Sequence, residues 1–443
     1  MHPPSESYVE AQMAMKRRIN KSHAHLFAWG LSILFLFVGV VVSEAATYYV
    51  APNGDDANSG SDLTPFKTIQ RGMRSLVAGD TLNIRGGIYP ERINSNSQTI
   101  PTGNSWSDAP VIAAFPGEMV VLQPAGGAEV VNLAHPYIKY VVFRDLVLDG
   151  SGLQRTCSSG YGCSYGVSVT NGAHHVRFSN TEIKNAGGSG ILMTRGSSST
   201  PTAIEFIGCN VHHNGVEARD HGFYLATSGN LVRNCKVHDN AGYGVHIYTG
   251  NTSVTADNNT IDGNDVYGNA TTSGSAPGIL VDNGTGNLVM NNVVRLNKNG
   301  IQVGNPWTSS ATASLTKVYN NTVYNNMPGL GIDIFASSSQ TEVKNNIVYK
   351  NGGAIGNKGV STVTSNNLLT DPKFVDELGG NFKLQSTSPA VNQGVILSLV
   401  PIDLAGVTRP QLGTHDMGAY EFTSTSGDTT PPAQPVIRSI STP

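Results

Sequence analysis

Residues 244–248 read Gly-Val-His-Ile-Tyr, and a glycine followed by alternating apolar residues recurs from residue 166 to residue 334. The intervals between the repeat glycines are 24, 32, 22, 34, 22 and 31 residues, for Gly166, Gly190, Gly222, Gly244, Gly278, Gly300 and Gly331. A second short apolar segment and an Asn-rich turn follow, as in VRNCKVHDN and VMNNVVRLN. A shortest repeat of about 22 residues with such corners indicates a parallel β-helix, in which each coil buries the apolar face of the next.

Alternation along each strand divides the repeat into inward and outward side chains. The first and third residues after each glycine are apolar and are predicted to stack inward, as for Phe223 and Leu225. The second and fourth residues are predicted to face outward. They include Ser168, Leu192, Tyr224, His246, Leu280, Gln302 and Asp333 at the second position, and Tyr248 and Asp282 at the fourth.

Asparagines recur at two positions of the coil, and we interpret both sets as structural corners. The first set is Asn180, Asn234, Asn258, Asn291, Asn320 and Asn345, and the second is Asn214, Asn240, Asn264, Asn297, Asn326 and Asn351. Asparagine accepts the left-handed backbone conformation and bonds to nearby backbone, and stacked amides can bond to one another between coils.

Residues 1–45 have the pattern of an export signal. Basic residues at positions 16–18 and 21 precede an apolar run over 26–42, and small residues follow up to Ala45. This order predicts a secretory signal cleaved near Ala45, with an uncleaved membrane anchor as the alternative. We therefore expect a bacterial protein that is secreted or held at the cell surface, with membrane contact only through an uncleaved signal.

Composition and cysteine usage agree with an exported solenoid. Charged residues make up 13% of the chain, the net charge is −3 and no basic run occurs, which argues against a nucleic-acid partner. Cys157 and Cys163, in the loop CSSGYGC, are predicted to form a disulfide in an oxidising compartment. Cys209 and Cys235 occupy one position of adjacent coils and are interpreted as buried thiols, with a second disulfide as the alternative. A solenoid accommodates a chain of this length because it grows along one axis. We expect a monomer.

The segment after the signal predicts a cover for the first coil. Pro65–Leu76 fits a short amphipathic helix, with Phe66, Ile69, Met73 and Leu76 on one face. The surrounding residues resemble the start of family 9 polysaccharide lyases of the pectate lyase-like superfamily, at Tyr49-Val50, Asn53-Gly54, Gly60, Pro65–Ile69, Gly79-Asp80 and Gly87–Tyr89. The resemblance implies a secreted right-handed β-helix, but it includes no catalytic residue of that family.

The C-terminal part resembles the closing segment of bacterial surface β-helix proteins. The matching residues are Asp371-Pro372, Phe382–Leu384, Ser388–Ala390, Gly394, Arg409-Pro410, Asp416 and Gly418–Glu421. The predicted fold is therefore all-β, a single right-handed parallel β-helix with an N-terminal capping helix and an irregular C-terminal cap. Its parts are a cap and first coils over 46–165, regular coils over 166–370, a final coil and cap over 371–422, and a disordered linker over 423–443.

Irregular coils indicate where a ligand binds. Additions at 195–202, 264–276 and 305–314, together with 150–164 and 215–220, are predicted to wall a trough along one strand face. The floor holds Tyr224, His246, Tyr248, Asp282, Gln302 and Asp333, the edge holds Arg219, Asp220 and His221, and the walls hold Arg195 and Trp307. A trough suits a polymer, aromatic faces suit sugar rings, and carboxylates suit polar substituents or a Ca²⁺ ion.

Three functions stay open at this point. The first is a lyase or epimerase on an acidic polysaccharide, with catalytic candidates His246, Tyr248, Tyr224, His221 and Arg219 and substrate-binding candidates Arg195, Asp220, Asp282, Gln302, Trp307 and Asp333. The family resemblance implies a Lys or Arg base and Ca²⁺ held by several Asp. This sequence lacks that Asp cluster, so we predict a His and Tyr pair as base and acid and leave Ca²⁺ open. The alternatives are a non-catalytic glycan- or partner-binding protein and a glycoside hydrolase that uses Asp282 and Asp333.

Overall fold

The computed structural model describes residues 45–154, 164–197, 199–250, 254–272, 274–306 and 313–423. The predicted signal up to residue 44, the Cys157 and Cys163 loop, Trp307 and residues 424–443 lie outside these described residues. The fold below belongs to the unit Ala45–Pro443. Within the described part of the chain, no helix is long and apolar enough to cross a membrane.

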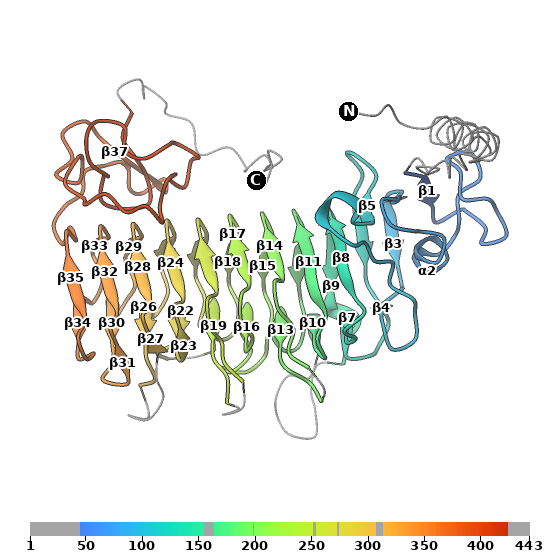
Figure 1. Cartoon of the computed structure of the whole chain (residues 1–443), viewed down its shortest axis with the longest axis horizontal. Helices are drawn as coiled ribbons and strands as arrows, with labels where there is room; N and C mark the ends of the chain where they lie inside the picture. The colour runs from blue at the N-terminus through green and yellow to red at the C-terminus, as the bar shows by residue number, and fades with distance from the viewer. Residues whose placement is uncertain are drawn as a thin grey trace, which may run out of the picture. The chain divides into compact units, whose positions relative to one another are not determined.

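Three long parallel sheets, stacked coil on coil along one axis, make up the described fold (Figure 1). Sheet 1 carries the repeat glycines and contains β4 (Ile93–Asn94), β7 (Glu129–Leu133), β10 (Tyr165–Val169), β13 (Ile191–Met193), β16 (Phe223–Leu225), β19 (Val245–Ile247), β22 (Pro277–Val281), β26 (Asn299–Val303), β30 (Leu330–Ile334) and β34 (Gly353–Asn357). Sheet 2 contains β1 (Thr47–Val50), β2 (Thr81–Ile84), β5 (Val111–Ala114), β8 (Lys139–Arg144), β11 (His174–Ser179), β14 (Glu205–Ile207), β17 (Leu231–Arg233), β20 (Thr260–Asp262), β24 (Leu288–Met290), β28 (Lys317–Tyr319), β32 (Glu342–Lys344) and β35 (Val363–Ser365). Sheet 3 contains β3 (Gly87–Tyr89), β6 (Val120–Leu122), β9 (Leu146–Asp149), β12 (Glu182–Lys184), β15 (Asn210–His212), β18 (Lys236–His238), β21 (Asp265–Tyr267), β25 (Val293–Arg295), β29 (Thr322–Tyr324) and β33 (Ile347–Tyr349).

The inward residues of sheet 1 form the continuous column that the alternation predicts. Phe223 pairs with Val245, which pairs with Ile279 in the next coil, and all three side chains are fully buried. The repeat glycines are required because the coils approach closely there. A Cβ atom on Gly222 would lie 2.6 Å from the carbonyl oxygen of Gly244. The predicted fold class and the side-chain register are confirmed.

Asparagines serve the corners in two physically different ways. Every member of the first predicted set has a positive φ, from 49° at Asn180 to 59° at Asn345, so these residues make the left-handed corners. The second set does not adopt positive φ. Its side chains instead form a buried amide ladder through Asn214, Asn240, Asn269, Asn297, Asn326 and Asn351.

The prediction that Asn264 belongs to the second set of asparagines is wrong. This residue belongs to a second ladder with Asn292, Asn321, Asn346 and Asn367, and Asn269 takes its place in the first. In each ladder an amide nitrogen donates to the side-chain oxygen of the next coil. Buried polar side chains are thereby satisfied by repetition, which explains why asparagine is so frequent in this chain.

The helix predicted over 65–76 is shorter than expected. Helix α2 spans Ile69–Met73, because Phe66 instead exchanges backbone hydrogen bonds with Tyr49 and Ala51 beside β1. The Thr68 hydroxyl accepts from the Arg71 amide at the start of the helix. The four predicted apolar residues, Phe66, Ile69, Met73 and Leu76, are nevertheless all buried in the main core.

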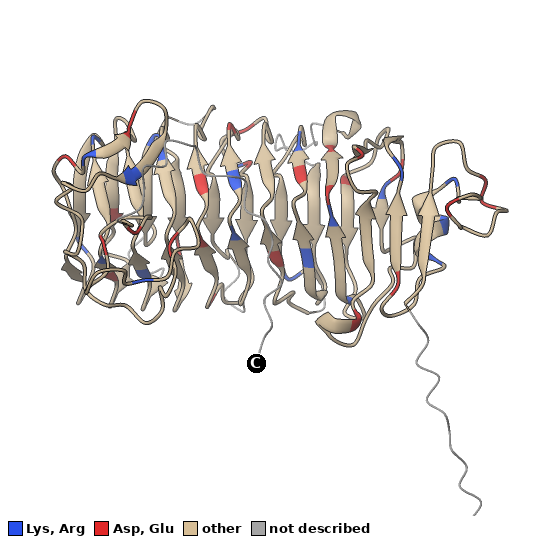
Figure 2. Ribbon diagram, turned by 90° about the horizontal axis from the view of Figure 1, so that it is seen from above, with Lys and Arg blue, Asp and Glu red and all other residues tan. Residues whose placement is uncertain are grey.

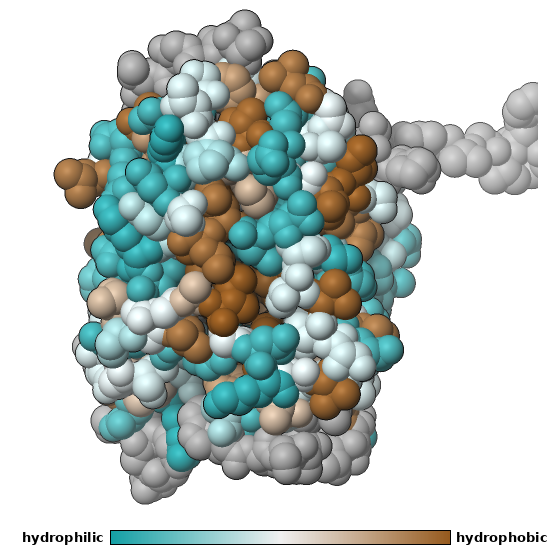
Figure 3. All heavy atoms as spheres, turned by 90° about the vertical axis from the view of Figure 1, so that its left-hand side faces the viewer, coloured by the Kyte–Doolittle hydropathy of each residue, from teal (hydrophilic) through white to brown (hydrophobic). Residues whose placement is uncertain are grey.

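The C-terminal segment is irregular, as predicted, but it packs against the flank of the last coils (Figure 1). Its antiparallel strands β36 (Phe374–Asp376) and β37 (Asn381–Leu384) contribute to a cluster with outward residues of β25, β29 and β33. The end of the stack is left partly open, since Val360 and Val363 of the last coil are 61% and 49% exposed. Figure 3 views this end and shows hydrophobic residues across its centre.

A buried ion pair organises the C-terminal segment. Arg409 Nη1 lies 2.6 Å from Glu421 Oε2, and less than 2% of either side chain is exposed. Arg409 Nη2 also donates to the Gly418 carbonyl, and the Asp416 amide donates to Glu421. Four of the residues that carry the C-terminal resemblance thus take part in this network, namely Arg409, Asp416, Gly418 and Glu421.

Surface charge and the remaining cysteines agree with the sequence interpretation. Lys and Arg are interspersed with Asp and Glu along the coils in Figure 2. Cys209 and Cys235 are buried free thiols on adjacent coils, as favoured from the sequence.

Candidate active site

The outward face of sheet 1 gathers aromatic and ionisable side chains on neighbouring strands. Tyr224 of β16 pairs in register with His246 of β19, and their ring centroids are 5.4 Å apart. His246 also stacks on Tyr248, at 5.2 Å and nearly parallel. Neither Tyr224 nor His246 belongs to the apolar core, although only 7% of His246 is exposed. The structure therefore brings the central predicted residues together on the predicted face.

Two histidines at the edge of this face are linked by hydrogen bonds. The Tyr243 amide donates to His221 Nδ1 at 3.1 Å, and His221 Nε2 lies 3.1 Å from His246 Nδ1. The His221 amide in turn donates to the Ser189 hydroxyl at 2.9 Å. His221 is 3% exposed and stacks on Tyr243 at 4.5 Å. This position is rigid, because backbone, hydroxyl and ring contacts all hold the same imidazole.

Asp282 completes the group from the end of β22. Its Oδ2 atom lies 3.6 Å from His246 Nε2, just beyond hydrogen-bond length. Its Oδ1 atom and the His246 Nε2 atom are buried and have no hydrogen-bond partner among the residues that the structure describes. Buried polar atoms are nearly always paired, so this pair of unpartnered atoms needs a chemical explanation.

Burial shifts the pKa values of the cluster in opposite directions. It lowers the pKa of His246 to about 3 and that of His221 well below its ordinary value, so both rings are neutral near pH 7. Burial raises the pKa of Asp282 to about 6, against a hydrogen bond from Asn305 that lowers it. Burial also raises the pKa of Tyr224, with the neighbouring Tyr248 and Asp282 adding to it. The Tyr224 phenol therefore keeps its proton.

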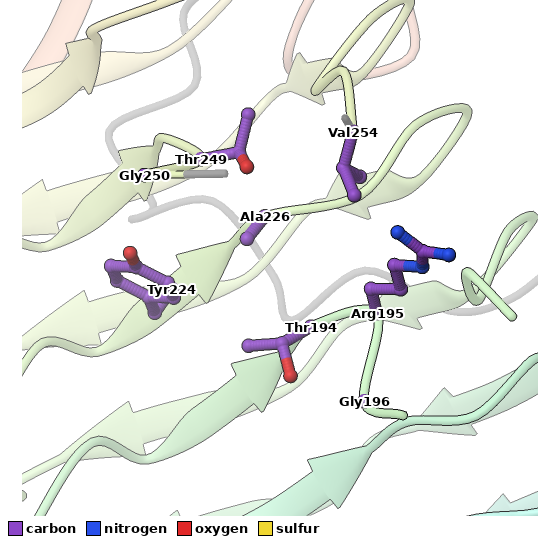
Figure 4. Close-up of a pocket in the computed structure, with 8 residues that line it drawn as sticks. All are labelled: Thr194, Arg195, Gly196, Tyr224, Ala226, Thr249, Gly250 and Val254. Carbon is purple, nitrogen blue, oxygen red and sulfur yellow. The ribbon is translucent and has the colours of Figure 1, made fainter. Parts of the chain in front are cut away.

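A pocket of about 320 Å³ opens beside this cluster. Thr194 and Arg195 follow β13, Tyr224 and Ala226 belong to the next coil, and Thr249, Gly250 and Val254 close the far wall (Figure 4). The Arg195 guanidinium forms no ion pair with any residue that the structure describes. Asn283, the residue after Asp282, holds Thr249 through two hydrogen bonds of 3.1 and 2.9 Å. The pocket thus adjoins the histidine and carboxylate group.

Other predicted site residues lie outside this group. The Asp220 carboxylate accepts the Val216 and Glu217 amides within its own loop. Arg219 is exposed at the edge, and Trp307 lies outside the described residues. Gln302 and Asp333 are on the same face but one and two coils beyond β22.

The register weakens the glycoside hydrolase alternative. Asp333 aligns with Gln302 and Leu280, so it is displaced from Asp282 by two coils and by two residues along the strand. Two coils at about 4.8 Å and two residues at about 3.3 Å each put the Cα atoms about 12 Å apart. The carboxyl groups of an inverting pair are separated by about 6.5–9.5 Å, so these two side chains would have to lean towards each other to reach that range.

The described residues do not fit a calcium site. Calcium takes six to eight oxygen ligands, commonly from several carboxylates. No group of three or more His, Cys, Asp or Glu side chains that could hold a metal occurs among the residues that the structure describes. We therefore derive no chemical step through a metal.

Sequence reasoning missed Tyr243 and the far wall of the pocket. Tyr243 and His221 both immediately precede a repeat glycine, so a comparison of that position across coils would have found the pair. The addition predicted at 264–276 has the wrong first residue and is shorter than predicted. It begins after Asn269, and the other extra residues of that coil lie between β19 and β20, where they supply Thr249, Gly250 and Val254.

Comparison with known proteins places the chain in a family. A family model described as the Pel9A-like right-handed β-helix region matches residues 48–367. The chain belongs to this family. The solved structure of pectate lyase Pel9A has a TM-score of 0.59 at 16% identity, covering 86% of this chain and 98% of that one. A rhamnogalacturonan lyase has a TM-score of 0.53 at 14% identity, covering 78% and 96%. At these identities the similarity establishes the Pel9A-like fold.

Two curated relatives match shorter segments of this Pel9A-like chain. Pectate lyase PEL9 of Emericella nidulans is 37% identical over 79 residues, which are 18% of this chain and 18% of that protein. The uncharacterized protein YwoF of Bacillus subtilis is 28% identical over 141 residues, 31% of this chain and 28% of that protein. The chain thus aligns with less than a third of the length of either relative.

Proposed function

We propose that this protein is an extracellular enzyme that acts on an acidic polysaccharide as a lyase or a C5 epimerase. The polymer would lie along the outward face of sheet 1, across the coils from β13 to β26. The family supports a polysaccharide substrate, since similar proteins include a pectate lyase and a rhamnogalacturonan lyase. The export pattern of residues 1–45 supports an extracellular site of action.

The observation that carries this proposal is the Arg195 guanidinium, which lines the pocket together with Tyr224 and has no ionic partner among the residues that the structure describes. A guanidinium binds a carboxylate through two parallel hydrogen bonds, and removal from water strengthens such a pair. Other arginines on the coils, such as Arg177 and Arg233, already pair with acidic side chains of the protein. Arg195 is therefore suited to the carboxylate of a uronic acid unit.

Both reactions begin with removal of a proton next to that carboxylate, and neutralising the carboxylate charge makes the proton easier to remove. An elimination also needs a proton donor for the leaving oxygen. Tyr224 fits this role, because its ring lies in the pocket wall and its raised pKa keeps the hydroxyl protonated before the reaction. Arg195 and Tyr224 thus supply charge neutralisation and an acid within one pocket.

Incubation of the purified full chain with a panel of polymers tests the proposal. The panel contains polygalacturonate, rhamnogalacturonan, alginate, a glycosaminoglycan and a neutral glucan, each with added Ca²⁺ and with a chelator. A lyase produces ultraviolet absorbance from unsaturated ends, and an epimerase incorporates deuterium at C5 from heavy water. Reducing ends without absorbance would show hydrolysis instead. Binding of acidic polymers without any product would show a glycan-binding protein and contradict the proposal.

A further inference from the structure

The hydrogen bonds of the cluster determine which ring nitrogens carry protons. A backbone N–H can only donate, so His221 Nδ1, which accepts from the Tyr243 amide, carries a lone pair. Neutral His221 therefore has its proton on Nε2, and that proton is donated to His246 Nδ1. His246 Nδ1 then also carries a lone pair, which leaves the His246 proton on Nε2, facing Asp282 at 3.6 Å. Along this series of contacts every proton points the same way, from the Tyr243 amide towards the Asp282 carboxylate.

We propose that His221 and His246 are positioning residues that hold Asp282, and that Asp282 is the proton acceptor of the site. This assignment rests on the proposed function and replaces the sequence-based choice of His246 as the base. His246 cannot serve as the base, because one ring nitrogen accepts from His221 and the other already carries a proton. The Oδ1 atom of Asp282 is buried and has no hydrogen-bond partner among the residues that the structure describes, so none of those residues occupies its lone pairs.

The surroundings of Asp282 support this role. The Asp282 carboxylate contributes to the raised pKa values of Tyr224 and Tyr243, and the His246 ring faces it. Asn305 contributes a neutral amide. No lysine or arginine pairs with Asp282 among the residues that the structure describes, so its carboxylate is not committed to a salt bridge. A carboxylate held by one neutral imidazole in a dry position is more basic than an ordinary surface aspartate.

The proton balance of an elimination is then complete. Asp282 takes the C5 proton and becomes an uncharged acid, and the electron pair of the C–H bond forms the C4–C5 double bond. The C4–O bond breaks, and the leaving oxygen takes the proton of the Tyr224 hydroxyl. Solvent then carries a proton from Asp282 to the Tyr224 phenolate and restores the site. In epimerisation the C–O bond stays intact, and C5 takes the proton of the Tyr224 hydroxyl on the opposite face, after which solvent again carries the Asp282 proton to the phenolate.

Nitrogen NMR of the full chain labelled with ¹⁵N-histidine tests the hydrogen-bond chain without any activity measurement. His221 and His246 are expected as neutral rings protonated at Nε2 that do not titrate between pH 5 and 8. Signals are assigned by their loss in His221→Gln and His246→Gln, with the exposed His213→Gln as the control. A His246 ring protonated at Nδ1, or charged at neutral pH, would overturn the proposal.

Activity profiles with the substrate found above test the role of Asp282. Asp282→Asn is expected to lower kcat by about 10²–10⁴-fold with little change in KM. The acidic limb of kcat/KM should move to higher pH in His221→Phe, which cannot donate to His246, and return towards the wild type in His221→Gln, which can. Full activity of Asp282→Asn, or equal profiles for the two His221 variants, would contradict the assignment. The expected NMR result without turnover on any polymer would instead contradict the proposed function and leave the hydrogen-bond chain standing.

Discussion

The Nε2 atom of His246 lies 3.6 Å from Oδ2 of Asp282, with 8% and 3% of their side chains exposed. The two groups respond to burial in opposite ways. The pKa of His246 falls to about 3, and the pKa of Asp282 rises to about 6. The folded pair therefore holds a proton on the carboxylate under conditions in which the unfolded chain holds it on the imidazole.

This pair predicts a specific dependence of stability on pH. As pH falls from about 6 to 4, the unfolded chain protonates His246 and the folded chain does not, which removes stability. Over the same range the folded chain protonates Asp282 before the unfolded chain does, which adds stability, so the two contributions largely cancel. Asp282→Asn should therefore lose about 1.4 kcal/mol of stability per pH unit more than the wild type across this window. Chemical denaturation at pH 4, 5 and 6 measures the difference, and parallel slopes for the two proteins would contradict it.

Arg195 is expected to contribute to substrate affinity. Loss of a hydrogen-bonded charge partner costs about 1.5–3 kcal/mol, so Arg195→Gln should raise KM or Kd for an acidic polymer by about 10- to 100-fold. Affinity for a neutral glucan should not change. Arg74→Gln, at an exposed position near the N-terminal cap, is the matched control. Equal binding by Arg195→Gln and Arg74→Gln would remove Arg195 from the site.

Two leucines on neighbouring strands test the inward and outward register. Leu225 is fully buried in the apolar column, whereas Leu192 is partly exposed on the outward face and pairs with Tyr224. Leu225→Asp should prevent folding, because it places an unpaired charge in the core. Leu192→Asp should fold, with a modest loss of thermal stability. Circular dichroism and soluble yield distinguish the two, and a folded Leu225→Asp would show that the register is reversed.

The two kinds of asparagine should respond differently to substitution. Asn292 is buried, accepts a hydrogen bond from the Asn264 amide and donates one to the Asn321 side-chain oxygen, so Asn292→Ala should cost about 1–3 kcal/mol or more. Asn258 has a φ of 54°, and glycine adopts that conformation without strain, so Asn258→Gly should be nearly neutral. Urea denaturation of both variants gives the comparison. Equal losses would mean that the ladder adds no stability beyond the corners.

The Arg409 and Glu421 pair should be sensitive to loss of either partner. Arg409→Met leaves the Glu421 carboxylate buried and unpaired, which costs about 3–5 kcal/mol in comparable buried pairs. The double variant Arg409→Met/Glu421→Leu should recover part of that loss. Denaturation of the single and double variants measures the coupling, and a double variant no more stable than Arg409→Met would contradict this account.

The sequence was sufficient for the solenoid, because its information is local and repeated. The alternation of inward and outward residues, as in Phe223, Tyr224 and Leu225, is visible within one strand, and the same pattern recurs in every coil. The same parity brought Tyr224, His246, Tyr248 and Asp282 to one face. Positions within a coil were less certain, and Asn264 was assigned to the wrong ladder because the intervals between repeat glycines vary.

What the sequence by itself determined is the architecture and the face of the sheet on which the candidate site lies. Only the tertiary structure decided the proton positions, since the Tyr243 amide, His221, His246 and Asp282 come from three successive coils. It also decided that the Asp220 carboxylate binds its own loop and that Arg195 is left without an ionic partner among the described residues. Periodicity specifies which way a side chain points, but hydrogen bonding and burial depend on neighbours that are distant in the chain, and these set the chemistry of the site.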